Sequence, residues 1–487
     1  MNPLTPGADG GRQTLVDTNH TRERQNVSTA TWRIVLLASL GGTLEFYDFV
    51  IFGVFAKDIA DAIFPNPTPL ISLIVSFAAF AAGYLARPLG GIVLSHFGDR
   101  YGRRRVFLVS IFVMSGATFG LGLVPSFATW GPAASVLMVV LRLIQGFCLG
   151  GELPGALTYV VETAPRHAPF VCGVVFSCVT MGVAAASGVS LALRTWLPSA
   201  VVATLGWRIA FLLGGLGGLL SFALRRSLEE SPEFTRMKEL ASTQPFREVL
   251  RTHLRPVALG ISILAATAGF NGLFFAHIAA YASSVLGYSP RQAVVSQTIG
   301  VVAHALGILA VGRLADRVHA RVLLRVGSLA LVALAFPFYS ALAGRSLNPT
   351  LLMMLAGLCA SLVNGAFAVV LTDLFPTRVR FSGVALGFNV AFTIFSGTAP
   401  LVATSLIRST GLSTAPAFVM VACGLFTFVG SLGLSRDGGY VLERERGGER
   451  SGHSGQDERS RPAAPAETPL LAPPLESVTT SSTQVEF

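Results

Sequence analysis

The chain has 487 residues, of which 52% are hydrophobic and 13% are charged, whereas soluble domains usually carry about 25% charged residues. This composition leaves too little polar surface for a water-soluble fold of this length. The formal net charge of +10 would suit nucleic-acid binding if the basic residues formed one patch, but they are spread over short loops.

Twelve apolar segments follow one another along the chain, each of about 18 to 30 residues and so able to cross about 30 Å of hydrocarbon as a helix. Their side chains do not alternate with a period of two, which argues against a transmembrane β-barrel. The sequence therefore predicts an all-α polytopic membrane protein with twelve transmembrane helices in two pseudo-symmetric six-helix halves. The spans are expected at Trp32–Phe55, Leu70–Leu94, Val106–Val124, Pro132–Val161, Phe170–Leu193 and Trp207–Leu224, then at Pro256–Leu286, Gln292–Val311, Val322–Leu342, Pro349–Leu371, Ser382–Ile407 and Thr414–Leu434.

Arginine is concentrated in the loops on one side of the predicted membrane, which the positive-inside rule assigns to the cytoplasm. Both termini should then be cytoplasmic. Residues 1–31 and 436–487 are polar and are expected to be disordered tails. Between the halves, 32–224 and 256–435, residues 225–255 are charged and partly amphipathic, which is typical of a cytoplasmic linker.

Charged residues recur at corresponding loops of the two halves, and two such halves place a solute site near the midplane between them. This arrangement favours alternating access over a static pore. The carboxylates can pair with arginines of neighbouring helix ends and hold the cytoplasmic side closed; alternatively, the charges only fix the topology. The predicted gating residues are Asp99, Arg100, Arg103 and Arg104 after span two, Glu162 after span four, Asp316 and Arg317 after span eight, and Asp373 and Arg378 after span ten.

Several motifs occur in order along the chain. They are Leu44-Glu45-Phe46-Tyr47-Asp48-Phe49, Ala86-Arg87-Pro88-Leu89-Gly90-Gly91 with Phe97-Gly98-Asp99-Arg100-Tyr101-Gly102-Arg103-Arg104, Arg142-Leu143-Ile144-Gln145-Gly146 with Gly150-Gly151-Glu152, Gly206-Trp207-Arg208, Glu230-Ser231-Pro232-Glu233-Phe234 and Phe375-Pro376-Thr377-Arg378-Val379-Arg380. Through them, the region from Trp32 to Arg436 resembles the major facilitator superfamily, and within it the metabolite:proton symporter family. That family includes bacterial carriers for citrate, 2-oxoglutarate, shikimate and proline or betaine, so the resemblance implies a multi-pass protein of a bacterial inner membrane. Phe46, Ser95 and Ala210 stand where the family usually has Trp, Gly and Pro.

Ionisable side chains inside the bilayer are costly and are therefore candidates for function. Glu45 and Asp48 are three residues apart and share a face of span one, and Arg142 is expected near the midplane in span four. Protonation of a carboxylate that faces Arg142 would release the arginine for an anionic substrate, and apolar surroundings favour the neutral acid. We interpret these three residues as proton-coupling residues; the alternative is a permanent structural ion pair between spans one and four.

Arg87 is expected in the cytoplasmic third of span two, where its planar guanidinium could bind a carboxylate or pair with Glu152 or Asp48 as scaffold. Other polar side chains inside the spans complete the predicted substrate site. They are Arg142, Gln145, Asn271, His277, Tyr281 and Asn389. His277 and Tyr281 share a helix face, although a single histidine on an apolar helix is often a packing residue.

Together these features predict a secondary transporter that carries a small organic acid of di- or tricarboxylate type with protons, by alternating access. The alternatives are proton-coupled uptake of a zwitterionic osmolyte such as betaine or proline, drug export, and metabolite sensing without transport. The sequence has no nucleophile motif, metal-ligand set or nucleotide-binding loop, so neither enzyme activity nor a cofactor is expected. The expected partners are the small-molecule substrate, protons and membrane lipid, without nucleic acid, and the chain should act as a monomer.

Overall fold

The computed structural model of the protein describes residues 29–101, 103–163, 167–226, 245–377 and 379–434, and the regular structure of these residues is helical throughout. Within them, nine helices, some of them broken, are long and apolar enough to cross a membrane, and α1 with α2 makes a tenth span that bends by 61°. Two shorter apolar helices, Leu108–Leu123 and Pro416–Leu432, complete the set. Each predicted span is thus a helix or a broken helix. Most of the predicted tails and linker (1–28, 227–244 and 435–487) lies outside the described residues.

Two spans of the first half are interrupted. Phe55 lies at the bend between α1 and α2, and span four is broken between α6 and α7 by the three-residue turn η1, which contains Gly150 and Gly151. The bounds in this half are α1 Thr29–Val54, α2 Ala56–Ile63, α3 Pro69–Tyr101, α4 Arg103–Leu123, α5 Phe127–Trp130, α6 Pro132–Cys148, η1 Leu149–Gly151, α7 Glu152–Thr163, α8 Ala168–Trp196, α9 Ser199–Val201, η3 Val202–Gly206 and α10 Trp207–Arg226.

The second half begins after a short amphipathic helix, α12, that falls within the predicted linker. The bounds are α12 Pro245–Thr252, α13 Leu254–Phe270, η4 Asn271–His277, α14 Ile278–Ser284, α15 Pro290–Ala315, α16 Ala320–Ala343, α17 Pro349–Asn364, α18 Phe367–Thr372, α19 Arg380–Ala391, η5 Phe392–Gly397, α20 Ala399–Thr410 and α21 Pro416–Leu432.

Spans six, seven and eleven each contain a π-helical segment, η3, η4 and η5. Such segments are rare, and they often lie at functional sites. The side-chain amide of Gln297 on α15 donates to the carbonyl oxygens of Phe274 and Phe275 in η4, both at 2.8 Å. Gln297 therefore supports η4 where its backbone departs from the α-helix.

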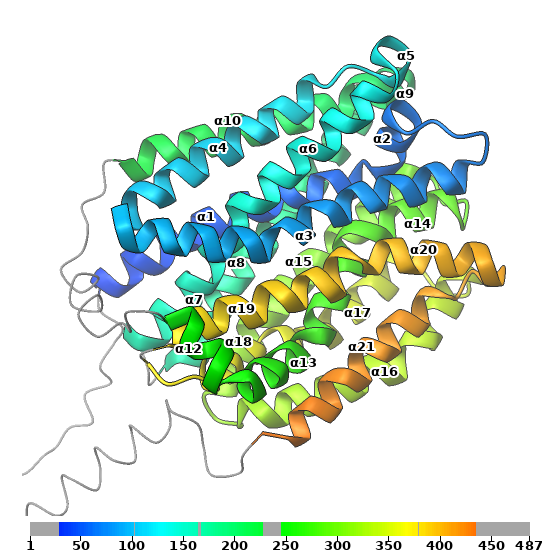
Figure 1. The fold of residues 1–487 in the computed structure, drawn as a ribbon. Coiled ribbons are helices and arrows are strands. Elements are labelled where there is room, and N and C mark those ends of the chain that lie inside the picture. The colour runs from blue at the N-terminus through cyan, green and yellow to red at the C-terminus, as the bar shows by residue number, and fades with distance from the viewer. Residues whose placement is uncertain (1–28, 102, 164–166, 227–244, 378, 435–487) are drawn as a thin grey trace, which may run out of the picture. The chain divides into compact units, whose positions relative to one another are not determined.

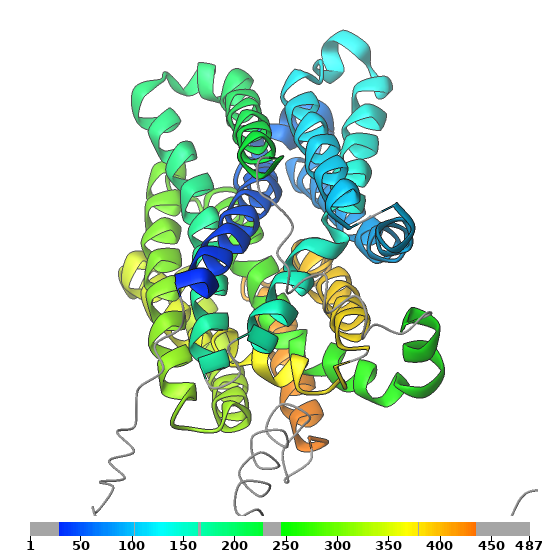
Figure 2. The same ribbon diagram turned by 90° about the vertical axis from the view of Figure 1, so that its left-hand side faces the viewer.

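Neighbouring helices pack both within and between the halves. α4 lies beside α10, and α16 beside α21 (Figure 1). α1, drawn in dark blue, packs against α8 and α10 (Figure 2). Between the halves α8 packs along α15, where the hydroxyl of Ser177 donates to the Ala305 carbonyl oxygen at 2.9 Å. The hydroxyl of Thr393 in η5 likewise donates to the carbonyl oxygen of Tyr84 on α3 at 2.7 Å.

Gly53 permits a close approach between α1 and η4. A Cβ atom at this position would stand 2.5 Å from the Cα atom of Ala276, which is closer than atoms can approach. Only glycine therefore allows span one to meet span seven at this distance. The contact joins the two halves of the bundle.

The bundle has two ends, which we name by their connections. The charged end carries the connections 101–103, 163–168, 315–320 and 372–380, and the opposite end carries 63–69, 123–132, 284–290, 343–349 and 410–416. At the opposite end Arg194 on α8 pairs with Asp58 on α2 at 2.6 Å. Both ends thus carry charged side chains that hold helices together.

Candidate functional site

Glu45 and Asp48 lie one helical turn apart on α1 but have different neighbours. Nη2 of Arg87 on α3 donates to Oε1 of Glu45 at 3.3 Å, and the two side chains are at most 2% exposed. A buried charge is stable only when it is paired. Among the described side chains the partner of Arg87 is therefore Glu45 and not Asp48; the side chain of Glu152, the other predicted partner, is not described.

Asp48 is connected to Arg142 through two neutral side chains. Nη1 of Arg142 donates to Oε1 of Gln145 at 2.5 Å, and Nε2 of Gln145 donates to Oγ1 of Thr118 at 2.9 Å. Thr118, on α4, then donates to Oδ2 of Asp48 at 3.2 Å. All four side chains are buried. The negative charge of Asp48 and the positive charge of Arg142, at the two ends of this series of hydrogen bonds, attract each other. The predicted pairing of Asp48 with Arg142 is thus indirect.

Aromatic rings surround both buried arginines. Cζ of Arg142 lies 4.2 Å from the ring centroid of Phe49 and 4.7 Å from that of Phe52. Cζ of Arg87 lies 5.8 Å from the Phe49 centroid and 5.3 Å from that of Tyr84. Both guanidinium groups thus lie near the same ring, that of Phe49. Nε and Nη2 of Arg142 have no hydrogen-bond partner among the described residues, so these donors are available to an anion.

His277 and Tyr281 stack on each other in span seven, with ring centroids 5.4 Å apart. Nε2 of His277 is 3.1 Å from the hydroxyl of Thr404 on α20, and the His277 ring lies 5.5 Å from that of Phe77 on α3. The hydroxyl of Tyr281 donates to the Ser413 carbonyl oxygen at 2.6 Å. These contacts place the two residues where span seven meets spans two and eleven, and they leave both the substrate role and the packing role open.

Asn271 and Asn389 lie in π-containing spans and have contrasting surroundings. Asn271, at the start of η4, is 3% exposed, and neither of its side-chain polar atoms finds a hydrogen-bond partner within the described part of the chain. Asn389 on α19 donates to the carbonyl oxygen of Gly150 in η1 at 2.5 Å. Asn389 therefore joins the halves, whereas Asn271 presents unused hydrogen-bonding capacity inside the bundle.

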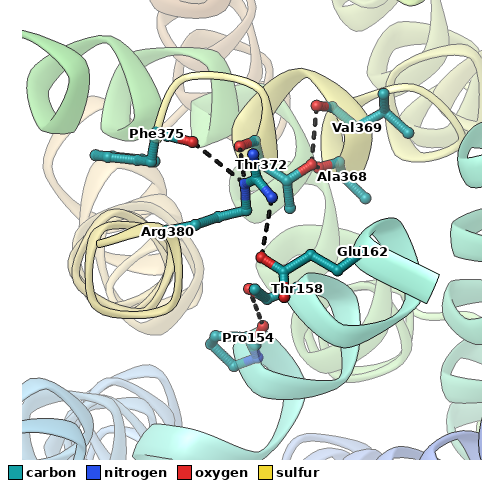
Figure 3. Close-up of polar contacts among 8 residues, drawn as sticks. All are labelled: Pro154, Thr158, Glu162, Ala368, Val369, Thr372, Phe375 and Arg380. Atoms are coloured by element: carbon teal, nitrogen blue, oxygen red, sulfur yellow. Dashed lines mark hydrogen bonds and ion pairs between the residues drawn. The ribbon is translucent and has the colours of Figure 1, made fainter. Parts of the chain in front are cut away.

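An ion pair joins the halves at the charged end (Figure 3). Nη1 of Arg380, the first residue of α19, donates to Oε1 of Glu162 on α7 at 2.9 Å. Nε of the same arginine donates to the carbonyl oxygens of Thr372 and Phe375, both at 3.2 Å. Glu162 was predicted to gate the charged end, and its partner among the described residues is Arg380. Arg378 lies outside the described residues.

Other predicted gating residues also make contacts at the charged end. Asp316, just after α15, accepts the backbone N–H of Phe170 on α8, which again joins the halves. Asp373 pairs with Arg321 at 3.2 Å inside the second half, and Arg317 is exposed. For Asp99, Arg100, Arg103 and Arg104 the helical backbone is described and the side chains are not.

Sequence reasoning missed Thr118, Arg380 and the support given by Gln297. A threonine in an apolar helix gives no signal, because its hydroxyl usually bonds to its own helix backbone. Arg380 stands in the same motif as Arg378. Its position at the start of a span, where a buried arginine must find a partner, could have identified it.

Comparisons with known proteins bear on the family and the fold of the chain. The Major Facilitator Superfamily profile matches residues 38–400. The citrate-proton symporter of Klebsiella pneumoniae is 33% identical over 401 residues, which cover 80% of this chain and 89% of that protein. The proline/betaine transporter of Escherichia coli K12 is 30% identical over 418 residues, or 82% of each chain. The ectoine/proline transporter ProP of Corynebacterium glutamicum is 32% identical over 78% of this chain and 79% of its own length.

Solved structures share the fold. The proton:xylose symporter XylE bound to 6-bromo-6-deoxy-D-glucose matches with a TM-score of 0.65 at 17% identity, over 84% of this chain and 95% of that chain. Another XylE structure, in a partially occluded inward open conformation, has a TM-score of 0.65 at 18% identity, over 83% and 97%. The predicted twelve-helix architecture is thereby confirmed, and the chain belongs to the Major Facilitator Superfamily, as a membrane transport protein and not an enzyme.

Proposed function

We propose that the protein is a proton-coupled symporter that carries a small organic acid with two or three carboxylates by alternating access. The observation that supports this most directly is the pair of buried arginines beside Phe49, one of which is linked to the buried acid Asp48. In this proposal Arg142 binds one carboxylate of the substrate through its free donors, and Arg87 binds a second one in exchange for Glu45; charge-assisted hydrogen bonds of this kind are strong and directional.

Protonation of Asp48 provides the coupling in this proposal. While Asp48 is ionised, its charge attracts Arg142 through the chain of Gln145 and Thr118. A proton on Asp48 removes that attraction. The positive charge of Arg142 and its two free donors are then available to a substrate carboxylate. Release of the substrate allows the proton to leave, because an unbalanced buried cation favours an ionised acid nearby.

The contacts between the halves are the proposed gates. Glu162–Arg380 and Asn389–Gly150 would separate when the bundle opens at the charged end. Gly53 and Ala276 would separate when it opens toward the opposite end. By the positive-inside rule, the arginine-rich connections support a cytoplasmic position in a bacterium for the charged end, and with it for both termini.

A zwitterionic osmolyte such as betaine is a second candidate. The similarity to proline/betaine transporters is nearly as high as that to citrate-proton symporters. In addition, aromatic rings such as Phe49, Phe80 and Tyr84 form a cluster, and aromatic faces bind quaternary ammonium groups. Arg142 already covers the faces of Phe49 and Phe52, so an ammonium group would compete with it. We therefore favour the acid.

The test is uptake into proteoliposomes containing the purified protein. Labelled citrate, 2-oxoglutarate, shikimate and betaine are supplied with and without an inward proton gradient. Gradient-driven accumulation of one acid, lost in Asp48→Asn and in Arg142→Ala, is the expected result. Accumulation of betaine alone would support the osmolyte function. If none of the four accumulates, symport of these solutes is wrong.

A further inference from the structure

The hydrogen-bond chain between Arg142 and Asp48 has a fixed direction. A guanidinium group only donates hydrogen bonds, so the amide atom of Gln145 that faces Arg142 must be oxygen. The amide nitrogen then faces Thr118, whose oxygen accepts from it. The single hydroxyl hydrogen of Thr118 is therefore directed to Oδ2 of Asp48. Every bond in the chain follows from the presence of the arginine.

The two oxygens of Asp48 consequently differ. Oδ2 accepts the Thr118 hydroxyl, while Oδ1 has no hydrogen-bond partner among the described residues although Asp48 is only 1% exposed. Oδ1 faces the position where Gly214 on α10 lacks a side chain, and a Cβ atom there would overlap it. The same added atom would stand 2.9 Å from Cε1 of Tyr47 and 3.3 Å from Cγ2 of Thr118.

We infer that Oδ1 of Asp48, the oxygen beside Gly214 that has no hydrogen-bond partner among the described residues, is the atom that takes up the transported proton, and that Thr118 and Gln145 are positioning residues that hold Oδ2 toward Arg142. The inference deepens the proposed function and rests on it. The proton adds to a lone pair of Oδ1 and leaves by the same atom. The three hydrogen bonds that lead from Arg142 through Gln145 and Thr118 to Oδ2 need not rearrange in either step.

The surroundings of Asp48 define what can influence this proton. Arg142 on α6 is the charged group that interacts with it, and its titratable neighbours on α1 are Tyr47 and, one turn away, Glu45, which is paired with Arg87 of α3. α4 and α10 contribute Thr118 and Gly214. α8 contacts α1 through uncharged groups, with the Thr43 hydroxyl on the Cys178 carbonyl oxygen and Phe46 on Phe176. The Thr118 hydroxyl is thus the neutral donor that stabilises the ionised form.

The experiment is an infrared titration of the full-length protein in lipid vesicles, without any substrate. The carbonyl-stretch band of protonated Asp48 is identified as the band that disappears in Asp48→Asn. Thr118→Val removes the hydroxyl that donates to ionised Asp48 and keeps the shape of the side chain. In this variant the Asp48 band should titrate about one to two pH units higher than in the wild type, which corresponds to a tenfold to hundredfold rise in the proton affinity of Asp48. Thr118→Ser keeps the hydroxyl and should restore the wild-type midpoint.

A second pair of variants tests Oδ1 itself. Gly214→Ala places a methyl group on this oxygen and should shift both the frequency and the midpoint of the band. Gly217→Ala, one turn further along α10, is the matched control, because a Cβ atom there meets only Leu44 at 3.4 Å. Equal spectra for Gly214→Ala and the wild type would overturn the assignment of Oδ1, and an unshifted Thr118→Val would overturn the role of Thr118.

These outcomes are separable from those of the uptake test. If gradient-driven uptake occurs while Thr118→Val titrates as the wild type, the proposed function stands and the positioning role is wrong. If Asp48→Asn removes no band between mildly acidic and alkaline pH, Asp48 does not exchange a proton and the inference fails. If none of the tested solutes is taken up while Thr118→Val still shifts the titration midpoint of Asp48, symport of these solutes is rejected and the assignment of the proton site at Asp48 stands.

Discussion

Arg380 and Glu162 connect the two halves of the protein at the charged end, with Nη1 of the arginine 2.9 Å from Oε1 of the acid. The side chain of Arg380 is 5% exposed and that of Glu162 is 14% exposed. The arginine also donates to two carbonyl oxygens in the connection before α19. One side chain thus secures both a local turn and a contact between halves.

Replacement of Arg380 should therefore cost stability as well as transport rate. We expect Arg380→Ala to lower the free energy of unfolding by about 2 kcal/mol, because buried acceptors lose a charged donor. Glu162→Gln, which leaves the local turn intact, should have a smaller effect. Thermal unfolding in detergent measures both. Arg317→Ala is the control, since Arg317 is exposed at the same end; an equal loss in this control would show that the effect is not specific to the contact.

The pair of Glu45 and Arg87 should show strong coupling. Removing one member leaves the other charge buried, so we expect Glu45→Leu and Arg87→Leu each to destabilise the protein by about 3 kcal/mol. The double variant should be less destabilised than the sum of the single variants. A double-mutant cycle of unfolding midpoints gives the coupling, and additive effects would mean that the two charges do not stabilise each other.

Asp48→Asn should separate proton coupling from substrate movement. The amide cannot ionise, so a proton gradient should no longer drive accumulation, whereas exchange of internal for external substrate should continue. Counterflow of the transported solute in proteoliposomes measures the exchange. Arg142→Ala should lose both activities, because the proposed substrate cation is gone. Retention of gradient-driven accumulation by Asp48→Asn would exclude Asp48 as the coupling acid.

Gly53→Leu should prevent closure between α1 and η4. The added side chain cannot fit against Ala276, so the bundle should remain open toward the opposite end and transport should stop. In this variant a cysteine introduced at Ala280, which is 3% exposed, should react faster with a polar maleimide than in the wild-type background. Gly116→Ala is the control, because a Cβ atom there meets nothing within 4 Å. Unchanged labelling in Gly53→Leu would contradict the role of this contact.

The spans and their order could be predicted from the sequence because apolar length is a direct requirement of the bilayer. The partners inside the bundle could not. Helical periodicity places Glu45 and Asp48 on one face, but it does not show that Arg87 lies beside the first and Thr118 beside the second. Those neighbours depend on how the helices are arranged in space, which a single sequence does not contain.

Some helix interruptions were also beyond sequence reasoning. The bend between α1 and α2 occurs at Phe55, two residues after Gly53, but a glycine in a transmembrane helix often serves close packing and does not by itself indicate a bend. η4 is supported by two hydrogen bonds between helices, in which the Gln297 amide donates to carbonyl oxygens of span seven. Gly150 and Gly151, by contrast, could have suggested the break at η1. Local signals therefore predict local breaks, and tertiary contacts decide the others.

The π-helical segment η4 affects how this chain is aligned with other transporters. A π turn holds one residue more than an α turn. A relative whose span seven is a continuous α-helix therefore matches the positions before Asn271 and those after His277 only if a one-residue gap is placed between them. An ungapped alignment that is correct at Asn271 would assign a role belonging to Tyr281 to its neighbour Ala280.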